Sequence, residues 1–230
     1  MKKIVLCGYG WSGCEALDLL LKKNYEVFVF THKCKYFESD LEKFCKNKKI
    51  NYSLKIISKK ILPFKPDLII SVSYRHRIPD DVLSFSRFQP FNLHPSLLPK
   101  YRGCSSLTWA MVNGEKKCGF TFHYMDSNFD TGNIIFQKST NIKSYDLQLT
   151  LFYRVMFESM RYFEQVLRLV FNNVKGKKQK GKGSYYARGA PYKGIINKNW
   201  PREKKNNFIK AMIFPPRPLA KYKGKSVIKY

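Results

Sequence analysis

Along the first third of the chain, short apolar runs alternate with a segment whose apolar residues recur at helical spacing. Residues 2–7 and 26–30 are short apolar runs, and the apolar positions of residues 16–21 lie at helical spacing between them. Residues 66–73 form another apolar run. A strand, a turn, a helix and a further strand in this order are typical of an open, mostly parallel sheet flanked by helices. The pattern therefore predicts an α/β fold with a twisted sheet.

The chain continues this alternation and then changes character. Residues 175–183 contain only lysine, glycine and one glutamine, a composition that predicts a basic flexible linker. Residues 184–230 are rich in aromatic residues and proline, and we expect them to pack on the main domain, or to extend it, as a short C-terminal appendage. The main domain is then residues 1–174. It contains predicted helices at 39–48, 80–83, 106–113 and 148–171, and predicted strands at 91–94, 119–125 and 133–137.

Composition excludes several classes of protein. A hydrophobic content of 44%, with 16% aromatic residues, is enough for a packed core. No apolar run approaches the ~20 residues that a membrane span needs, and no secretory signal is recognisable, so we expect a cytoplasmic protein. The cysteines show neither a CxxC pair nor a histidine at metal-ligand spacing, so we expect reduced thiols and no metal site. They are Cys7, Cys14, Cys34, Cys45, Cys104 and Cys118.

The formal net charge of +27 arises from 43 basic residues, of which 10 are arginine, against 16 acidic residues. Nucleic-acid readers rely on arginine for bidentate contacts, whereas lysine spread along a chain is often only a solvated surface. The net charge therefore leaves four explanations open: a lysine-rich solvated surface, a polyanionic substrate, RNA, or an anionic membrane face.

The glycine turn at residues 8–13 matches the pattern G-x-G-x-x-G between a strand and a helix. A dinucleotide site of this kind also needs an acidic residue at the end of the second strand. That strand ends in Thr31, His32 and Lys33, and the large side chain of Trp11 lies within the turn. The pattern therefore favours a tight turn in a Rossmann-like sheet, and an NADP-dependent oxidoreductase is the weaker alternative.

Candidate chemistry lies at the end of the predicted strand 91–94. Asn92 and His94 are two residues apart, so both side chains leave the same face of that strand. The carboxyl edge of a parallel sheet is where such folds bind ligands. An amide N–H and a protonated imidazole both donate hydrogen bonds, and together they suit a developing oxyanion. A neighbouring carboxylate would orient the imidazole and favour its charged form.

Residues 91–103 contain N-x-H-x-S-L-L-P-x-x-R-G, and Asp130-Thr131-Gly132 follows. This combination resembles the folate-dependent formyltransferases, over most of residues 1–140. The resemblance implies that residues 1–174 are the catalytic domain, that Asn92, His94 and Asp130 are catalytic, and that N10-formyltetrahydrofolate donates the formyl group without a metal. It also implies that two loops hold the pterin, namely Tyr74, Arg75, His76, Arg77 and Ile78 in one, and Asp126 in the other.

The tail distinguishes among these enzymes. Some 50 residues follow the linker, too few for the second barrel of methionyl-tRNA formyltransferases, and the purine enzyme usually ends sooner. The tail resembles the C-terminal segment of enzymes that N-formylate nucleotide-linked amino-dideoxysugars, especially dTDP-4-amino-4,6-dideoxyglucose. Several relatives carry a second arginine at the position where this chain has Cys104. The identity of the amino sugar is therefore not assigned by the resemblance. The candidate substrate contacts are Arg102, Gly103, Cys104, Ser105, Trp200, Lys210 and Phe214.

The resemblance thus implies a nucleotide-sugar N-formyltransferase that serves O-antigen or other lipopolysaccharide synthesis. We expect no stable nucleic-acid partner and no membrane association, and the family implies a homodimer. The alternatives are a compact enzyme similar to methionyl-tRNA formyltransferase and a basic module that binds RNA or another polyanion on an inactive scaffold. His76 and His123 lie outside the catalytic pattern, and we interpret His123 as structural or as a residue that supports a catalytic side chain.

Overall fold

The computed structural model describes residues 1–33 and 40–229. The chain forms two compact units, each assembled from three segments. Unit 1 comprises Met1–His94, Phe122–Phe136 and Glu158–Gln179, and unit 2 comprises Pro95–Thr121, Gln137–Phe157 and Lys180–Tyr230. The predicted division of the chain at residue 174 stays a prediction.

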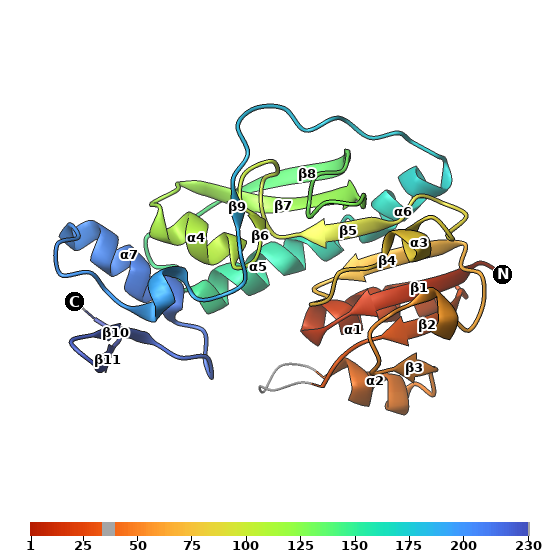
Figure 1. The fold of residues 1–230 in the computed structure, drawn as a ribbon, viewed down its shortest axis with the longest axis horizontal. Helices are drawn as coiled ribbons and strands as arrows, with labels where there is room; N and C mark the ends of the chain where they lie inside the picture. Colours follow the sequence, from red (N-terminus) through yellow and green to blue (C-terminus); the bar gives the residue numbers. More distant parts are fainter. Residues whose placement is uncertain (34–39, 230) are drawn as a thin grey trace. The chain divides into compact units, whose positions relative to one another are not determined.

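Unit 1 is built on parallel strands (Figure 1). Strand β1 (Lys3–Gly8) pairs in parallel with β2 (Glu26–Phe30) and β4 (Leu68–Val72), and β4 pairs in parallel with β5 (Phe91–His94). The full sheet has the order β3-β2-β1-β4-β5-β7-β8. Its remaining strands are β3 (Tyr52–Ser53), β7 (Lys117–Tyr124) and β8 (Ile134–Asn141). The predicted α/β fold with a mostly parallel sheet is therefore confirmed.

Apolar clusters cover both faces of this sheet within unit 1. On one face, Val5 and Ile69 belong to a buried cluster that includes Val82 of α3 (Asp80–Leu83). On the other face, the rings of Phe91 and Phe122 each contact Phe163 of α6 (Phe163–Phe171). Burial on both faces explains why β1 and β4 are almost continuously apolar instead of alternating.

Local signals account for the other helices that line the sheet. Helix α1 (Gly10–Lys22) starts within the glycine turn of residues 8–13. Helix α2 (Leu41–Asn47) starts after Asp40, whose side chain accepts a hydrogen bond from the Glu42 N–H. Residue 39, where the sequence predicts that this helix starts, lies outside the described residues.

The single helix predicted for residues 148–171 is wrong. The structure has α5 (Gln148–Met160) and then α6, with a break at Tyr162. Tyr162 is the N-cap of α6, with φ −103° and ψ −1°, and its ring stacks on Phe136 with a centroid distance of 4.6 Å. Both helices bury an apolar face, so the apolar period continues across the break. The sequence pattern therefore does not reveal that the helix is interrupted.

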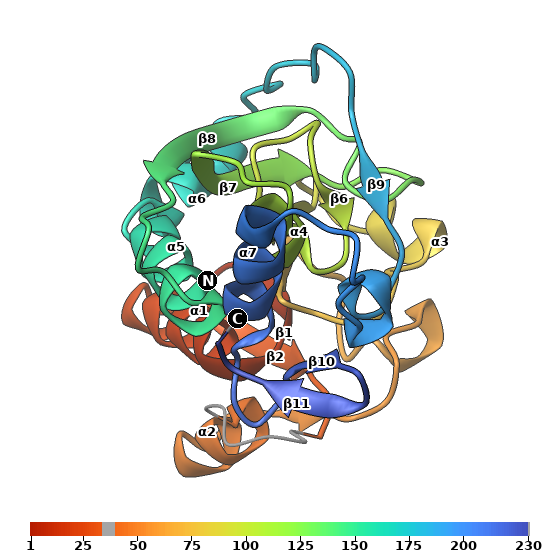
Figure 2. The same cartoon turned by 90° about the vertical axis from the view of Figure 1, so that its left-hand side faces the viewer.

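Unit 2 contains elements that the sequence pattern does not predict. One of them is helix α7 (Arg202–Met212), which packs beside α4 (Ser106–Val112), the helix predicted at residues 106–113, as Figures 1 and 2 show. Strand β9 (Tyr185–Tyr186) pairs in parallel with β6 (Arg102–Gly103), and β10 (Ala220–Tyr222) forms a hairpin with β11 (Lys225–Val227). These elements escape prediction because α7 is largely polar and strands of two or three residues show no alternation. The 3₁₀ turns are η1 (Lys59–Ile61) and η2 (Pro191–Gly194).

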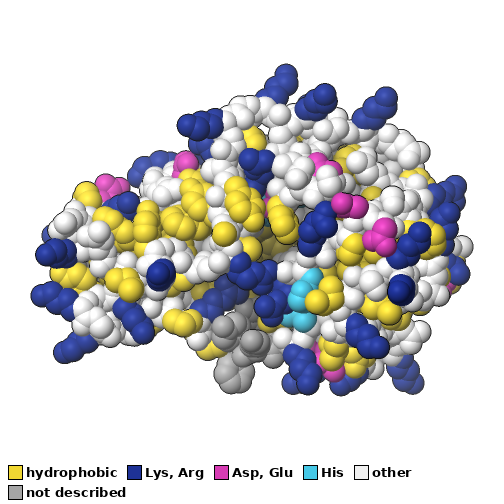
Figure 3. All heavy atoms as spheres, in the orientation of Figure 1, with side chains coloured by type: hydrophobic (Ala, Val, Ile, Leu, Met, Phe, Trp, Pro, Cys, Tyr) yellow, Lys and Arg dark blue, Asp and Glu magenta, His cyan; other side chains and the backbone are white. Residues whose placement is uncertain are grey.

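Five cysteines lie in the described residues and all are free thiols, while Cys34 lies outside them. Four of the five are buried, and burial raises the pKa of Cys45 and of Cys118 to about 12. Cys104 is partly exposed. Lys and Arg side chains are scattered over the face that Figure 3 shows, without a single basic patch. In the described part of the chain, none of the helices has the length and apolar character needed to cross a bilayer.

Candidate active site

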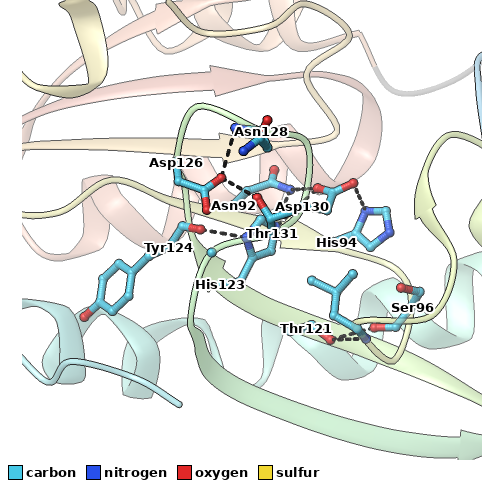
Figure 4. Close-up of polar contacts among 12 residues, drawn as sticks. Asn92, His94, Ser96, Thr121, His123, Tyr124, Asp126, Asn128, Asp130 and Thr131 are labelled. Atoms are coloured by element: carbon cyan, nitrogen blue, oxygen red, sulfur yellow. Dashed lines mark hydrogen bonds and ion pairs between the residues drawn. The ribbon is translucent and has the colours of Figure 1, made fainter. Parts of the chain in front are cut away.

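Asn92, His94 and Asp130 come together in unit 1, as the sequence predicts (Figure 4). Asn92 and His94 lie on β5, and Asp130 lies in the loop between β7 and β8. The Nδ2 of Asn92 is 3.4 Å from Oδ1 of Asp130, and Nδ1 of His94 is 3.6 Å from Oδ2. The two carboxylate oxygens therefore face different partners.

This site is largely withdrawn from solvent. The side chain of His94 is 6% exposed and that of Asp130 is 11% exposed. Charges at such a site interact more strongly than they would in water, because less solvent screens them. A carboxylate that is 3.6 Å from His94 consequently favours the imidazolium form of that ring.

A second histidine completes the cluster. The Nε2 of His123 is 3.1 Å from Nδ2 of Asn92 and 3.3 Å from Oδ1 of Asp130, and Nδ1 is 2.8 Å from the carbonyl oxygen of Tyr124. Of the two interpretations of His123, these contacts favour that of a residue that supports catalytic side chains, because it touches two members of the candidate site. A sequence signal for these contacts requires knowing that β5 and β7 are neighbours in the sheet.

Several contacts hold the loop that carries Asp130. The side chain of Asp126 accepts hydrogen bonds from Thr131 Oγ1 and from the Asn128 N–H. The amide of Gln179 donates to the carbonyl oxygens of Asp130 and Gly132. Gln179, which lies in the predicted linker, thus contacts this loop specifically, and its lysine- and glycine-rich surroundings do not predict that role.

Gly132 allows this loop to approach β7 closely. A Cβ atom added to Gly132 would lie 1.9 Å from the carbonyl oxygen of Tyr124, which is a backbone atom and has little freedom to move. We expect Gly132→Ala to lower the free energy of unfolding by about 1–3 kcal/mol and to displace Asp130, because the loop must shift. Thermal melting of the purified variant measures the first effect.

The matched control for this variant is Gly181→Ala. A Cβ at Gly181 meets no atom within 4 Å, so only the strain of its positive φ of 89° remains. Equal melting temperatures for Gly132→Ala and Gly181→Ala would contradict the close approach at Gly132.

The two loops that the resemblance assigns to the pterin lie together in unit 1. Arg77 donates through Nη2 to the carbonyl oxygen of Ser127 and pairs with Asp80. Ile78 is buried, whereas the side chains of Arg75 and Arg77 are exposed to solvent. Arg77 therefore ties the loop of residues 74–78 to the loop of residues 126–130.

Aromatic rings gather at the carboxyl ends of β1, β2 and β4. The ring of Tyr9 stacks on His32 with a centroid distance of 4.1 Å, and His76 meets His32 and Tyr74 edge-on at 5.9 Å and 5.4 Å. Burial raises the pKa of Tyr74 to about 12, so its hydroxyl stays protonated at neutral pH. Neither Tyr9 nor His32 is a predicted site residue, since the three strand ends meet only in the folded sheet.

The glycine turn serves packing within unit 1. A Cβ atom on Gly8 or on Gly13 would lie about 3.0 Å or less from Cδ2 of Leu41, the first residue of α2. The Leu41 side chain therefore lies against the two glycines. This contact supports the interpretation of the turn as a packing feature.

The candidate substrate residues Arg102, Gly103, Cys104 and Ser105 lie in unit 2. Arg102 and Gly103 form β6, and the Cys104 N–H donates to the carbonyl oxygen of Tyr186 in β9. Among the described residues, the buried Nε of Arg102 has no hydrogen-bond partner. This part of the chain thus leaves one buried arginine donor unsatisfied.

The other three candidate substrate residues also lie in unit 2, each with its own contacts. Trp200 packs edge-on against Tyr192, and Lys210 donates to the carbonyl oxygen of Ser144. Phe214 is 3% exposed and contacts Phe152. Their roles toward a substrate stay predictions.

A metal centre has no candidate ligands in the described ranges 1–33 and 40–229. No group of three or more His, Cys, Asp or Glu side chains there is arranged to hold an ion.

Comparison with known proteins finds sugar N-formyltransferases among the proteins that this chain is similar to. A GDP-perosamine N-formyltransferase of Brucella melitensis is 43% identical over 157 residues, which cover 68% of this chain and 61% of that enzyme. The sugar 3N-formyl transferase WlaRD, solved with dTDP and 5-N-formyl-THF, is 26% identical with a TM-score of 0.83, over 100% of this chain and 85% of that chain.

Fold similarity extends to an N-formyltransferase from Helicobacter canadensis, solved with folinic acid and dTDP-3-aminofucose. It is 24% identical with a TM-score of 0.82, and the match covers 100% of this chain and 87% of that chain. The family model for formyl transferases matches residues 13–167. The chain therefore belongs to the formyl transferase family.

Proposed function

We propose that this protein transfers the formyl group of N10-formyltetrahydrofolate to the amine of a nucleotide-linked amino sugar. The observation that carries the proposal is the meeting of Asn92, His94 and Asp130 in a largely buried site of a formyl transferase family member. The named relative and WlaRD act on sugars, and WlaRD was solved with a formylated folate, which supports both halves of the proposal.

The carboxyl edge of the sheet suits a formylated folate. Half-buried aromatic side chains at Tyr9, His32, Tyr74 and His76 offer flat faces to a pteridine, and the loops joined by Arg77 flank Asp130. These loops would hold the donor through Tyr74 to Ile78 and Asp126. The donor supplies a formyl carbon that is electrophilic enough for attack by an amine.

Asn92 and His94 stabilise the negative charge that develops on the formyl oxygen. An amide N–H of Asn92 donates one hydrogen bond, and the imidazolium of His94 donates a second, charge-assisted bond. Both side chains lie on one rigid strand, so they are in place before the reaction starts. Such preorganised donors stabilise the charge of the transition state without first having to move into position.

Asp130 accepts the proton that the attacking amine must lose. Its carboxylate keeps His94 charged from Oδ2 at 3.6 Å and takes a proton from the amine once the new C–N bond has formed. The same proton is returned to N10 of the folate as the old C–N bond breaks. The products are a formamido sugar and tetrahydrofolate, and the protons balance without a metal.

The identity of the amino sugar that accepts the formyl group is a separate part of the proposal. The tail resemblance favours dTDP-4-amino-4,6-dideoxyglucose, while the Brucella relative acts on GDP-perosamine and WlaRD was solved with dTDP. The stacked rings of Trp109 and Tyr186 in unit 2, with a centroid distance of 4.4 Å, offer a surface of the kind that stacks on a base. Roles in O-antigen synthesis, a cytoplasmic location and a homodimer stay predictions.

Mass spectrometry tests the proposal directly. We expect the protein, given N10-formyltetrahydrofolate and an amino sugar linked to dTDP or GDP, to yield a sugar nucleotide heavier by one formyl group less one hydrogen. A parallel reaction with the corresponding sugar nucleotide that carries a hydroxyl in place of the amine should give no product. Formylation of methionyl-tRNA, with none of any amino sugar nucleotide, would contradict the proposal.

A further inference from the structure

The protonation of His123 follows from its neighbours. A backbone carbonyl oxygen only accepts hydrogen bonds, so Nδ1 of His123, at 2.8 Å from the oxygen of Tyr124, carries a hydrogen. The carboxylate of Asp130 also only accepts, so the atom of Asn92 that faces it is the donor Nδ2. That same Nδ2 is 3.1 Å from Nε2 of His123. Two donors would repel each other at that distance, so the contact with Asn92, which is shorter than the 3.3 Å between Nε2 and the carboxylate of Asp130, assigns Nε2 as an acceptor.

Three atoms then form a nearly equilateral triangle. Its corners are Nδ2 of Asn92, Nε2 of His123 and Oδ1 of Asp130, and its sides are 3.1, 3.3 and 3.4 Å. The angle at each corner is therefore about 60°, whereas the two N–H bonds of a planar amide diverge by about 120°. Two N–H bonds about 120° apart cannot both point into a corner of about 60°, so when one N–H of Asn92 enters the triangle the other points out of it.

We infer that His123 is a positioning residue that fixes the direction of the free N–H of Asn92. Nε2 of His123 and Oδ1 of Asp130 share the first N–H as two acceptors, which settles both the orientation and the rotation of the carboxamide. The second N–H is then directed away from the carboxylate and is left for the formyl oxygen. This inference rests on the proposed function of Asn92 as an oxyanion donor.

The position of His123 suits this role. Its side chain is 2% exposed, and Nδ1 is held by the backbone of the strand that carries it. The ring therefore cannot turn without leaving a buried N–H unpaired, which is unfavourable. Asn92, by contrast, would lose one of its two fixed acceptors if Nε2 were absent, and its amide could then turn toward Asp130 alone.

Two substitutions separate the positioning role from a structural one. His123→Asn keeps an N–H for the carbonyl of Tyr124 but has no atom at the place of Nε2. His123→Gln keeps an acceptor near the place of Nε2 but gives up the bond to Tyr124. Turnover and thermal stability should therefore rank these variants in opposite orders.

We expect kcat to fall about tenfold or more in His123→Asn and to be at least partly restored in His123→Gln, with the KM of the folate changed by less than about threefold in both. We expect the melting temperature to be lower in His123→Gln than in His123→Asn. If kcat follows the melting temperature instead, or if His123→Asn turns over like the unsubstituted protein, His123 has only a structural role.

Nitrogen NMR tests the same inference without any reaction. In protein labelled with ¹⁵N histidine, the signals lost in His123→Gln identify the His123 ring. We expect Nδ1 to be protonated and Nε2 to show the shift of an unprotonated acceptor. A protonated Nε2 would overturn the inference, whether or not the protein formylates sugars. Conversely, a protein with an unprotonated Nε2 and no formyl transfer would place the failure in the proposed function.

Discussion

His94→Ala is expected to lower kcat by about 10²-fold or more while the protein stays folded. The imidazolium is the charged one of the two donors that face the formyl oxygen, and removing a single preorganised donor of this kind typically costs 10²–10³ in kcat. His94 lies at the end of β5 and is 5% exposed, so the substitution also leaves a small cavity. Steady-state formylation assays at saturating donor and acceptor measure the effect.

His94→Gln separates the charge of the ring from its capacity to donate. A glutamine amide donates a neutral hydrogen bond, so we expect a kcat between that of His94→Ala and that of the unsubstituted protein. Melting temperatures of both variants control for loss of folding. Turnover of His94→Ala within a factor of about three of the unsubstituted protein would refute the role of His94.

Asp130→Asn is expected to have an effect of similar size, again about 10²-fold or more on kcat. The substitution keeps the shape of the side chain but removes the charge that favours the imidazolium of His94, 3.6 Å away. It also removes the group that accepts the proton of the amine. The KM of the folate should change little, because the reacting groups and not the pterin loops are altered.

Asp67→Asn is the matched control for the charge change. Asp67 lies just before β4, at the opposite end of that strand from the candidate site, and accepts a hydrogen bond from the Lys3 N–H. Its substitution should leave kcat within about twofold. If Asp67→Asn and Asp130→Asn reduce turnover equally, the loss reflects general charge or stability and not the chemistry assigned to Asp130.

The sheet of unit 1 was predictable because its strands are buried on both faces. Burial forces continuous apolar runs such as residues 3–8 and 68–72, and these stand out against polar loops. The break at Tyr162 was not predictable, because the apolar period continues across it. Helix α7 was missed because most of its residues are polar and its stability depends on contact with α4.

The candidate site was predictable only in part. Asn92, His94 and Asp130 belong to two short motifs whose residue types suit one chemistry, so the sequence brings them to attention before the fold is known. His123 belongs to an alternating strand, where a polar residue gives no sign of what it faces. Its contact with Asn92 depends on β5 and β7 being neighbours, although 31 residues separate the two side chains along the chain.

The most direct measurement is a crystal structure of the slowed variant Asp130→Asn with N10-formyltetrahydrofolate bound. The account predicts that the formyl oxygen lies at hydrogen-bond distance, about 2.7–3.2 Å, from Nδ2 of Asn92 and from a ring nitrogen of His94. A donor bound with its formyl group directed away from both side chains, or bound elsewhere on the protein, would contradict the account.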